Sequence, residues 1–301
     1  MNGTIVTTAM IIILAASSAF AAVGPNIGSG NIIRALFELG GSEHFAALQH
    51  LNDAWVLPED YSLEVKQIDG VAGSLTIEWV QAKNTQPDKA ILQLHGGAYT
   101  RSLKDNGATY RRSAVQYAKL SGAAVLTVDY RVAPEHPHPA ALEDAVAAYN
   151  WLLSEGYQAD RIIIAGDSAG GGLALATALY LADHDMPMPA AIITMSAWTN
   201  LNYGRLVPAY VGDNPADHPY ISPIYGNYEG FPHMLMQVGG SEALLNDTIV
   251  VADNAKAAGV AVQQTSYAGM FHVFQMLFPQ LPEANAAWDE VAAFIAGVFG
   301  Q

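Results

Sequence analysis

The stretch Gly166-Asp167-Ser168-Ala169-Gly170 places one hydroxyl group between glycines, where two sequence patterns meet. The apolar run RIIIA before it indicates a strand, and the alanine- and leucine-rich run after it indicates a helix. A G-x-S-x-G sequence in this context is typical of a nucleophile elbow, a sharp strand-to-helix turn that exposes the serine oxygen. Glycines two positions either side let the chain turn this tightly. The sequence therefore predicts that Ser168 is a nucleophile; the alternative is a glycine-rich corner without chemistry.

A serine hydroxyl is a weak nucleophile and needs a base, which in turn needs an orienting acid. In hydrolases with such an elbow, the acid and then the histidine follow the serine along the chain. Three of the four downstream histidines are poorly placed, in a helix end, an irregular loop and a strand start: His184, His218 and His233. His272 follows the last predicted strand, so its loop would lie over the same sheet edge as Ser168. We predict that His272 is the general base, with an ordinary packed histidine as the alternative.

The acid is expected directly after the apolar run HMLMQVG, where the sequence continues GSEALLNDT. Glu242 is the first carboxylate past this predicted strand. Asp247 is the rival, but it lies where the next helix starts, and an acidic residue is favoured there by the helix dipole. We predict Glu242 as the acid and keep Asp247 as the alternative.

Backbone N–H donors for an oxyanion are expected in the loop LQLHGGAYTRS. After the strand that ends near Leu94, small residues let the N–H groups of Gly96, Gly97 and Ala98 approach a ligand closely. This loop resembles the HGGG-type oxyanion loop, with alanine in place of the third glycine. The amide of Ala169, the residue after the serine, is predicted to complete the hole.

These loops need a sheet that brings their ends together, and the chain from about residue 61 supplies one. Apolar, β-rich runs are expected to be strands over 62–69, 74–82, 90–95, 123–130, 161–166, 190–196, 233–239 and 261–268. Helical patterns fall between most of the later runs, over 111–120, 140–153, 169–182, 248–258 and 282–299. Strands apolar on both faces and separated by helices indicate a mostly parallel sheet with helices on both faces. The predicted fold class is therefore α/β, with a catalytic domain over 61–301.

Composition narrows the function. The 301 residues include 13 Lys and Arg against 28 Asp and Glu, a formal charge of −15, so most of the surface would repel nucleic acid. The chain has no cysteine, which excludes thiol catalysis and Cys-ligated metal. No zinc-type His/Glu spacing or dinucleotide fingerprint stands in the proper place, and we predict neither cofactor nor metal.

The N-terminal region has no strand signal. Residues 1–21 contain the apolar run 9–16 and end in Ala19-Phe20-Ala21, a signal-peptidase pattern, but they lack a positive charge. Two alternatives are left open: a signal peptide of an exported or periplasmic protein, and an apolar N-terminal helix of a cytoplasmic protein. The run is too short for an integral membrane anchor. Residues 22–60 are expected to form a helical cap element.

Together, the motifs HGGAY, VDYRVAPEHPHPAALEDA, GDSAGGGLA and GMFHVFQ resemble the hormone-sensitive-lipase-like (family IV) carboxylesterases of the α/β-hydrolase superfamily. The likeness covers most of residues 50–301. It implies the α/β-hydrolase fold, Ser168 as nucleophile, His272 as base, and an acid at the start of a D-P-L-x-D-type segment. That segment begins with Glu242 here, so glutamate stands where aspartate is commoner. The resemblance also implies a scaffolding role for Arg131 and Glu135.

One departure concerns the cap. Such esterases usually carry a longer helical insertion where this chain has only LNYGRLVPA, residues 201–209. We therefore expect a small, reduced helical cap, with a remnant near 200–228, and a more open, shallower substrate pocket.

These patterns predict a serine carboxylesterase that hydrolyses short- to medium-chain acyl esters through a Ser-His-Glu triad and an acyl-enzyme intermediate. The expected partner is a small-molecule ester, and a homodimer is left open. Two alternatives remain: an amidase or peptidase on the same triad, and a non-catalytic hydrolase-fold receptor.

Overall fold

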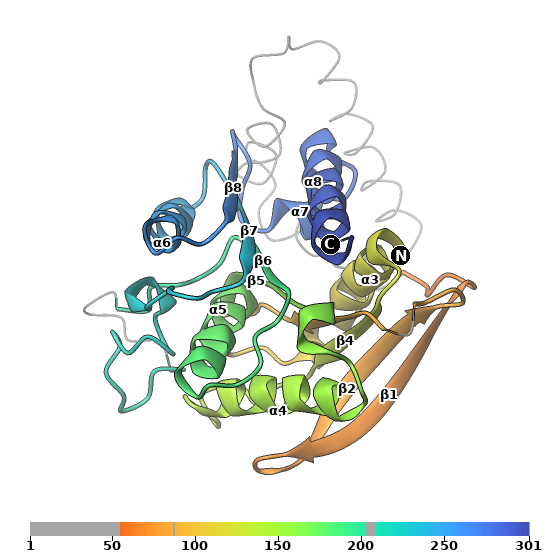
Figure 1. Cartoon of the computed structure of the whole chain (residues 1–301), viewed down its shortest axis with the longest axis horizontal. Coiled ribbons are helices and arrows are strands. Elements are labelled where there is room, and N and C mark those ends of the chain that lie inside the picture. The colour runs from red at the N-terminus through yellow and green to blue at the C-terminus, as the bar shows by residue number, and fades with distance from the viewer. Residues whose placement is uncertain (1–54, 87, 203–208, 301) are drawn as a thin grey trace, which may run out of the picture.

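Eight strands form one twisted sheet in the computed structural model, which describes residues 55–86, 88–202 and 209–300 (Figure 1). Their order across the sheet is β1-β2-β4-β3-β5-β6-β7-β8. The strands are β1 (Tyr61–Gly70), β2 (Gly73–Ala82), β3 (Ala90–Leu94), β4 (Ala124–Val128), β5 (Ile162–Asp167), β6 (Ala191–Met195), β7 (His233–Gly239) and β8 (Val262–Tyr267). β2 is antiparallel to its neighbours β1 and β4, and all strands from β4 to β8 across the sheet are parallel. The parallel strands therefore end at one common edge.

Helices cover both faces of the sheet (Figure 1). They are α3 (Leu103–Ser121), α4 (Ala140–Ser154), α5 (Ser168–Asp183), α6 (Leu245–Ala257), α7 (Phe274–Leu277) and α8 (Pro282–Phe299), with short 3-10 turns η1 (Ala159–Arg161) and η2 (Pro223–Tyr225). Helices α4, α5 and α6 pack into one hydrophobic core, and α3 and α8 pack into the core on the opposite face. Every residue of β3, β4, β5 and β6 is buried between these two layers.

The predicted α/β fold and its eight strands are confirmed, and two of the predicted helices start three or more residues earlier than expected. α3 begins at Leu103, eight positions before the predicted start, because Ser102 and Asp105 form a capping box there. Asn106 has non-helical angles that kink the first turn, so the helical periodicity becomes regular only beyond it. The short helix α7 was not predicted, and α6 begins at Leu245 rather than at 248.

Parts of the predicted cap lie outside the described residues. These are residues 1–54, which hold the expected signal peptide or apolar helix and most of the 22–60 element, and residues 203–208 of the 200–228 remnant. The described residues of that remnant form turns and η2 but no α-helix. The expectation of a shallow pocket under a reduced cap stays a prediction.

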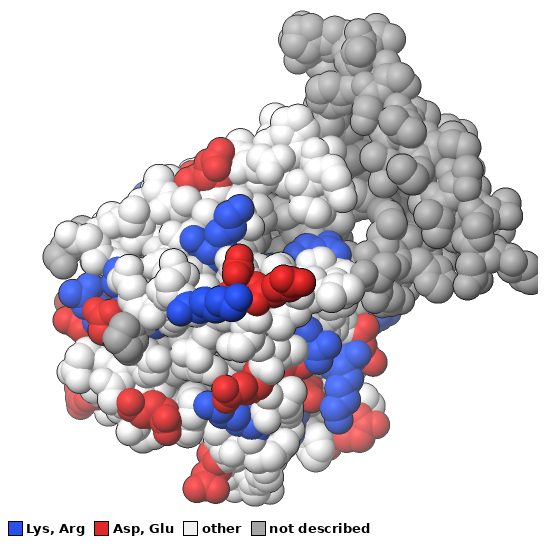
Figure 2. Space-filling model, turned by 90° about the vertical axis from the view of Figure 1, so that its right-hand side faces the viewer, with Lys and Arg blue, Asp and Glu red and all other residues white. Residues whose placement is uncertain are grey.

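The described surface carries charges of both signs. On the face drawn in Figure 2, Lys and Arg side chains lie among Asp and Glu side chains, with uncharged surface between them. The acidic excess is thus not gathered into one patch on that face. Within the described ranges, no helix is long and apolar enough to cross a membrane.

Candidate active site

The junction of β5 and α5 forms the elbow that carries Ser168. Ser168 has φ of +51°, a left-handed conformation that is costly for a residue with a side chain. A Cβ on Gly166 would lie 2.2 Å from the Gly170 carbonyl oxygen, and one on Gly170 would lie 2.1 Å from the Leu94 carbonyl oxygen. Only glycine allows these approaches: Gly166 lets the turn close on itself, and Gly170 lets the turn pack against the end of β3.

Three predicted residues meet at the C-terminal edge of the sheet. His272 Nε2 lies 2.9 Å from Ser168 Oγ, and His272 Nδ1 lies 3.0 Å from Glu242 Oε1. Ser168 follows β5, Glu242 follows β7 and His272 follows β8, so three parallel strands deliver them to one place. The carboxylate can only accept a hydrogen bond, so Nδ1 carries the proton and Nε2 can accept from the serine.

The Glu242 carboxylate is buried and well supplied with donors. Its side chain is 3% exposed, whereas that of His272 is 43% exposed. Oε2 accepts hydrogen bonds from Ser196 Oγ at 2.7 Å and from the Gly239 N–H at 2.8 Å, which leaves Oε1 facing the imidazole. These bonds fix the orientation of the carboxylate. Sequence reasoning did not find Ser196, because a single serine after a strand carries no distinctive spacing.

Asp247, the rival acid, faces a different loop. It lies in the first turn of α6, and one carboxylate oxygen accepts hydrogen bonds from the N–H groups of Thr199 and Asn200, at 3.3 and 3.0 Å. Burial raises its pKa, and these two N–H donors oppose that rise. Its hydrogen bonds therefore hold the segment after β6 and do not reach His272.

The loop after β3 changes one part of the predicted oxyanion hole. The Gly96 N–H donates inside the protein, to Tyr110 Oη at 2.7 Å and Asp167 Oδ1 at 3.2 Å, so Gly96 is removed from the candidate donors. Within the described ranges, the N–H groups of Gly97 and Ala98 find no acceptor. Both residues have positive φ, +120° and +55°. The alanine thus adopts the left-handed region in which a third glycine would be unstrained.

The remaining candidate donor lies at the start of α5. The N–H of Ala169 belongs to the first turn, where helical N–H groups have no intrahelical acceptor, and it finds no other among the described residues. The helix N-terminus also favours negative charge at this position. Gly97, Ala98 and Ala169 are therefore the candidate donors that the structure leaves free.

The buried carboxylate of Asp167 connects the elbow to this loop. Asp167, directly before the serine, accepts from Tyr110 Oη at 3.2 Å as well as from Gly96. Burial raises the pKa of Asp167 to about 6, an effect opposed by His272 and the hydrogen bonds. His95 stacks on Tyr130 with ring centroids 3.9 Å apart, and burial lowers the pKa of His95 to about 4. Sequence reasoning missed these supporting roles, because the partners come from separate elements.

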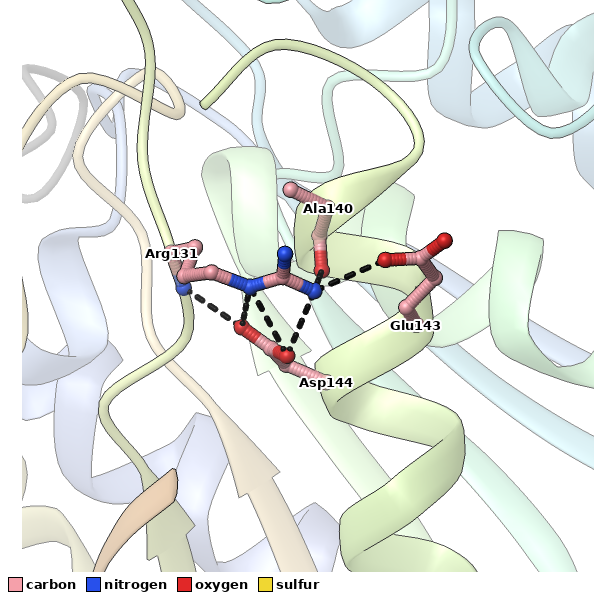
Figure 3. Close-up of polar contacts among 4 residues, drawn as sticks. All are labelled: Arg131, Ala140, Glu143 and Asp144. Atoms are coloured by element: carbon pink, nitrogen blue, oxygen red, sulfur yellow. Dashed lines mark hydrogen bonds and ion pairs between the residues drawn. The ribbon is translucent and has the colours of Figure 1, made fainter. Parts of the chain in front are cut away.

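Arg131 braces the segment after β4 (Figure 3). Its guanidinium donates to both oxygens of Asp144, to Glu143 and to the Ala140 carbonyl, and its N–H donates to Asp144. This anchors the segment to the first turns of α4, away from the reacting atoms, as expected of a scaffolding residue. Glu135 differs: it is exposed and forms no ion pair or hydrogen bond with the described residues, so the scaffolding role expected for it stays a prediction.

The described part of the chain contains no group of three or more His, Asp or Glu side chains placed to hold a metal ion. Groups that can perform proton transfer and nucleophilic attack are present at the sheet edge, and they form a linear chain from carboxylate to imidazole to hydroxyl. Such a chain is the arrangement that activates serine for attack on a carbonyl carbon.

Comparison with known proteins agrees with this chemistry. The family described as alpha/beta hydrolase fold matches residues 91–276. An acetyl-hydrolase of Streptomyces hygroscopicus is 35% identical over 249 residues, covering 76% of this chain and 82% of that protein. The crystal structure of EstE5 soaked with p-nitrophenyl butyrate has a TM-score of 0.74 and 36% identity, covering 85% of this chain and 92% of the other. A hormone-sensitive lipase from a metagenome library has a TM-score of 0.74 and 34% identity, covering 84% and 89%.

Proposed function

The chain belongs to the hormone-sensitive-lipase-like carboxylesterases of the α/β-hydrolase superfamily, and from this premise we propose that it cleaves short- to medium-chain acyl esters with Ser168, His272 and Glu242. The chain is a carboxylic ester hydrolase. To this activity the proposal adds the catalytic residues, the acyl-enzyme intermediate and the range of acyl chain lengths. The observation that carries it is the unbroken hydrogen-bond chain from Glu242 Oε1 through both imidazole nitrogens to Ser168 Oγ.

The first step is acylation. His272 Nε2 takes the hydroxyl proton as Ser168 Oγ attacks the ester carbonyl carbon. The carbonyl π-bond opens, so the oxygen becomes negatively charged in a tetrahedral intermediate. Glu242 stabilises the imidazolium that has formed and keeps its ring oriented. The tetrahedral intermediate then collapses, the bond from carbonyl carbon to alcohol oxygen breaks, and the imidazolium gives its proton to the leaving alcohol.

The oxyanion is proposed to accept hydrogen bonds from the N–H groups of Gly97, Ala98 and Ala169. Donors that are fixed before the reaction need no reorganisation as charge develops, and one such donor is worth about 10²–10³ in kcat. The buried bonds of Gly96 support this role indirectly, because they fix the start of the loop against Asp167 and Tyr110.

The second step releases the acid. Water loses a proton to His272 and attacks the acyl-enzyme carbonyl, and the collapse of the second tetrahedral intermediate returns the proton to Ser168. The products are a carboxylic acid and the free serine. The short-chain range is supported by p-nitrophenyl butyrate, the ester soaked into the similar EstE5 crystals.

An amidase or peptidase on the same triad would differ in the leaving group, an amine, which must be protonated by His272. The names of the similar proteins, acetyl-hydrolase and lipase, favour esters instead. A receptor without catalysis would not need the aligned serine and imidazole.

The test compares the wild type with Ser168→Ala on p-nitrophenyl acetate, butyrate and decanoate. Removing the nucleophile should reduce kcat/KM by about 10⁴-fold or more, whereas Ser154→Ala, at an exposed serine of α4, should change it less than twofold. Equal rates for the wild type and Ser168→Ala would disprove the proposed nucleophile. Faster cleavage of the matching p-nitroanilides would favour the amidase.

A further inference from the structure

Ser196 lies directly after β6, and its completely buried side chain contacts both the acid and the backbone that follows the base. We propose that Ser196 is a positioning residue whose hydroxyl locks the Glu242 carboxylate and the backbone after His272 into one arrangement. The proposal rests on the triad proposed above and adds a fourth residue to it. Ser196 does not touch the reacting atoms; it acts through its neighbours on both sides.

The hydroxyl of Ser196 both donates and accepts. Ser196 Oγ lies 2.7 Å from Glu242 Oε2 and 3.1 Å from the Val273 nitrogen. A carboxylate can only accept and an N–H can only donate, so the direction of both bonds is fixed. One side chain therefore connects the loop after β7, which bears the acid, to the loop after β8, which bears the base.

This connection selects which carboxylate oxygen faces the imidazole. Oε2 is held by Ser196 and by the Gly239 N–H, so Oε1 is directed to His272 Nδ1. The last torsion of a glutamate side chain is broad and has no single staggered minimum. Glutamate also has one more rotatable bond than aspartate, which is the commoner residue at this position in the family. External bonds to Oε2 are the means of fixing the longer side chain.

The backbone around these bonds supports the same conclusion. Ser196 has φ of +54° and Val273 has φ of +52°, both in the left-handed region. This region is unfavourable for most residues and especially for β-branched valine. The two strained residues are joined by the bond from the Val273 N–H to Ser196 Oγ, and the Ser196 N–H donates to the Gln237 carbonyl of β7 at 2.7 Å. Strain of this kind persists where surrounding contacts hold it, and it gathers at functional sites.

The first experiment measures kcat and KM for p-nitrophenyl butyrate with Ser196→Ala and Ser196→Gly. Alanine removes the hydroxyl and keeps the backbone restriction, whereas glycine removes the hydroxyl and relieves the positive φ. If the hydroxyl matters, both variants lose about 10- to 100-fold in kcat with KM within about twofold. Wild-type kcat in Ser196→Ala, or its recovery in Ser196→Gly, would overturn the proposal. Ser196→Cys has a weaker donor of similar shape, so its kcat should lie between those of the wild type and Ser196→Ala. This variant replaces Ser196→Ala in the test if the alanine variant does not fold.

The second experiment separates positioning from general support of the fold. If Ser196 acts through Glu242, Ser196→Ala should have little further effect on kcat once Glu242 is alanine, because the carboxylate it positions is gone. If the variant with both substitutions loses kcat by the product of the two single losses, Ser196 does not act through Glu242. The outcomes also distinguish the two proposals: full activity of Glu242→Ala refutes the triad, whereas an inactive Glu242→Ala with a fully active Ser196→Ala refutes only the role of Ser196.

Discussion

The two halves of the site are held by different forces. The nucleophile half, after β3 and β5, is shaped by backbone contacts at Gly166 and Gly170 so close that no Cβ fits. The acid–base half, after β6, β7 and β8, has one such backbone contact, at Gly239, and its acid and base are positioned by side-chain hydrogen bonds among Ser196, Glu242 and His272. Steric contacts tolerate no substitution, whereas hydrogen bonds weaken step by step. The comparison therefore predicts abrupt failure from substitutions at the elbow glycines and graded loss from substitutions of the acid–base side chains.

The largest effect is expected from Gly170→Ala in the nucleophile half. The added Cβ would lie 2.1 Å from the Leu94 carbonyl oxygen and 2.5 Å from the His95 carbonyl oxygen, so the turn and β3 must separate. We expect a loss of more than about 3 kcal/mol in the free energy of unfolding and no measurable esterase activity. Urea unfolding and p-nitrophenyl butyrate hydrolysis measure the two quantities.

A matched control exists in α8. A Cβ at Gly297 meets nothing within 4 Å, so Gly297→Ala should stabilise the protein by up to about 1 kcal/mol and leave activity unchanged. If Gly170→Ala behaved like Gly297→Ala, the steric account of the elbow would be wrong.

In the acid–base half, Glu242→Ala should fold and lose activity. Without the carboxylate, the imidazolium is less stable and its ring is less well oriented, so kcat should fall by about 10²–10⁴-fold. Asp247→Ala removes bonds to Thr199 and Asn200 only, so it should lower stability by about 1–3 kcal/mol with less than a tenfold loss in kcat. The reverse ranking of kcat would make Asp247 the acid.

A smaller effect tests the buried charge under the elbow. Burial raises the pKa of Asp167 from 3.8 to about 6, so the folded protein binds this proton more tightly than the unfolded chain. The contribution of Asp167 to stability is therefore highest below pH 4 and decreases as pH rises to about 6. Relative to the wild type, the free energy of unfolding of Asp167→Asn should increase by at most about 3 kcal/mol between pH 4 and about 6. Above pH 6 the difference should stay constant. Urea unfolding at several pH values measures the difference.

His95 provides the opposite trend and a check. Its pKa is lowered from 6.5 to about 4, so the unfolded chain takes up the proton first and the stability from His95 is lost as pH falls from 6.5 to 4. The wild type loses stability at His95 as the pH falls, and His95→Gln should not show this loss. The wild type loses stability at Asp167 as the pH rises, and Asp167→Asn should not show that loss. The free energy of unfolding relative to the wild type should therefore change with pH in opposite directions in the two variants. A change in the same direction in both would refute this view of the two buried groups.

The contrast between the halves also explains what the sequence could predict. Elbow glycines, apolar strand runs and the order of serine, carboxylate and histidine are local patterns, and they led to Ser168, Glu242 and His272. The bond from Gly96 to Asp167 joins residues 71 positions apart, and that from Val273 to Ser196 joins residues 77 apart. No local pattern encodes such pairs, because they exist only once the sheet has brought the loops together. For the same reason Gly96 was predicted to be a free donor.

Covalent labelling with a p-nitrophenyl alkylphosphonate, followed by peptide mass mapping, tests the proposed nucleophile most directly. Attack of the serine oxygen on phosphorus expels p-nitrophenolate and leaves the phosphonyl group on the protein. The account predicts one adduct, on Ser168, that forms at least 100-fold more slowly in His272→Ala and is absent from Ser168→Ala. Hydrolysis of p-nitrophenyl butyrate that continues after complete labelling of Ser168, or an inactivating adduct on another residue, would contradict it.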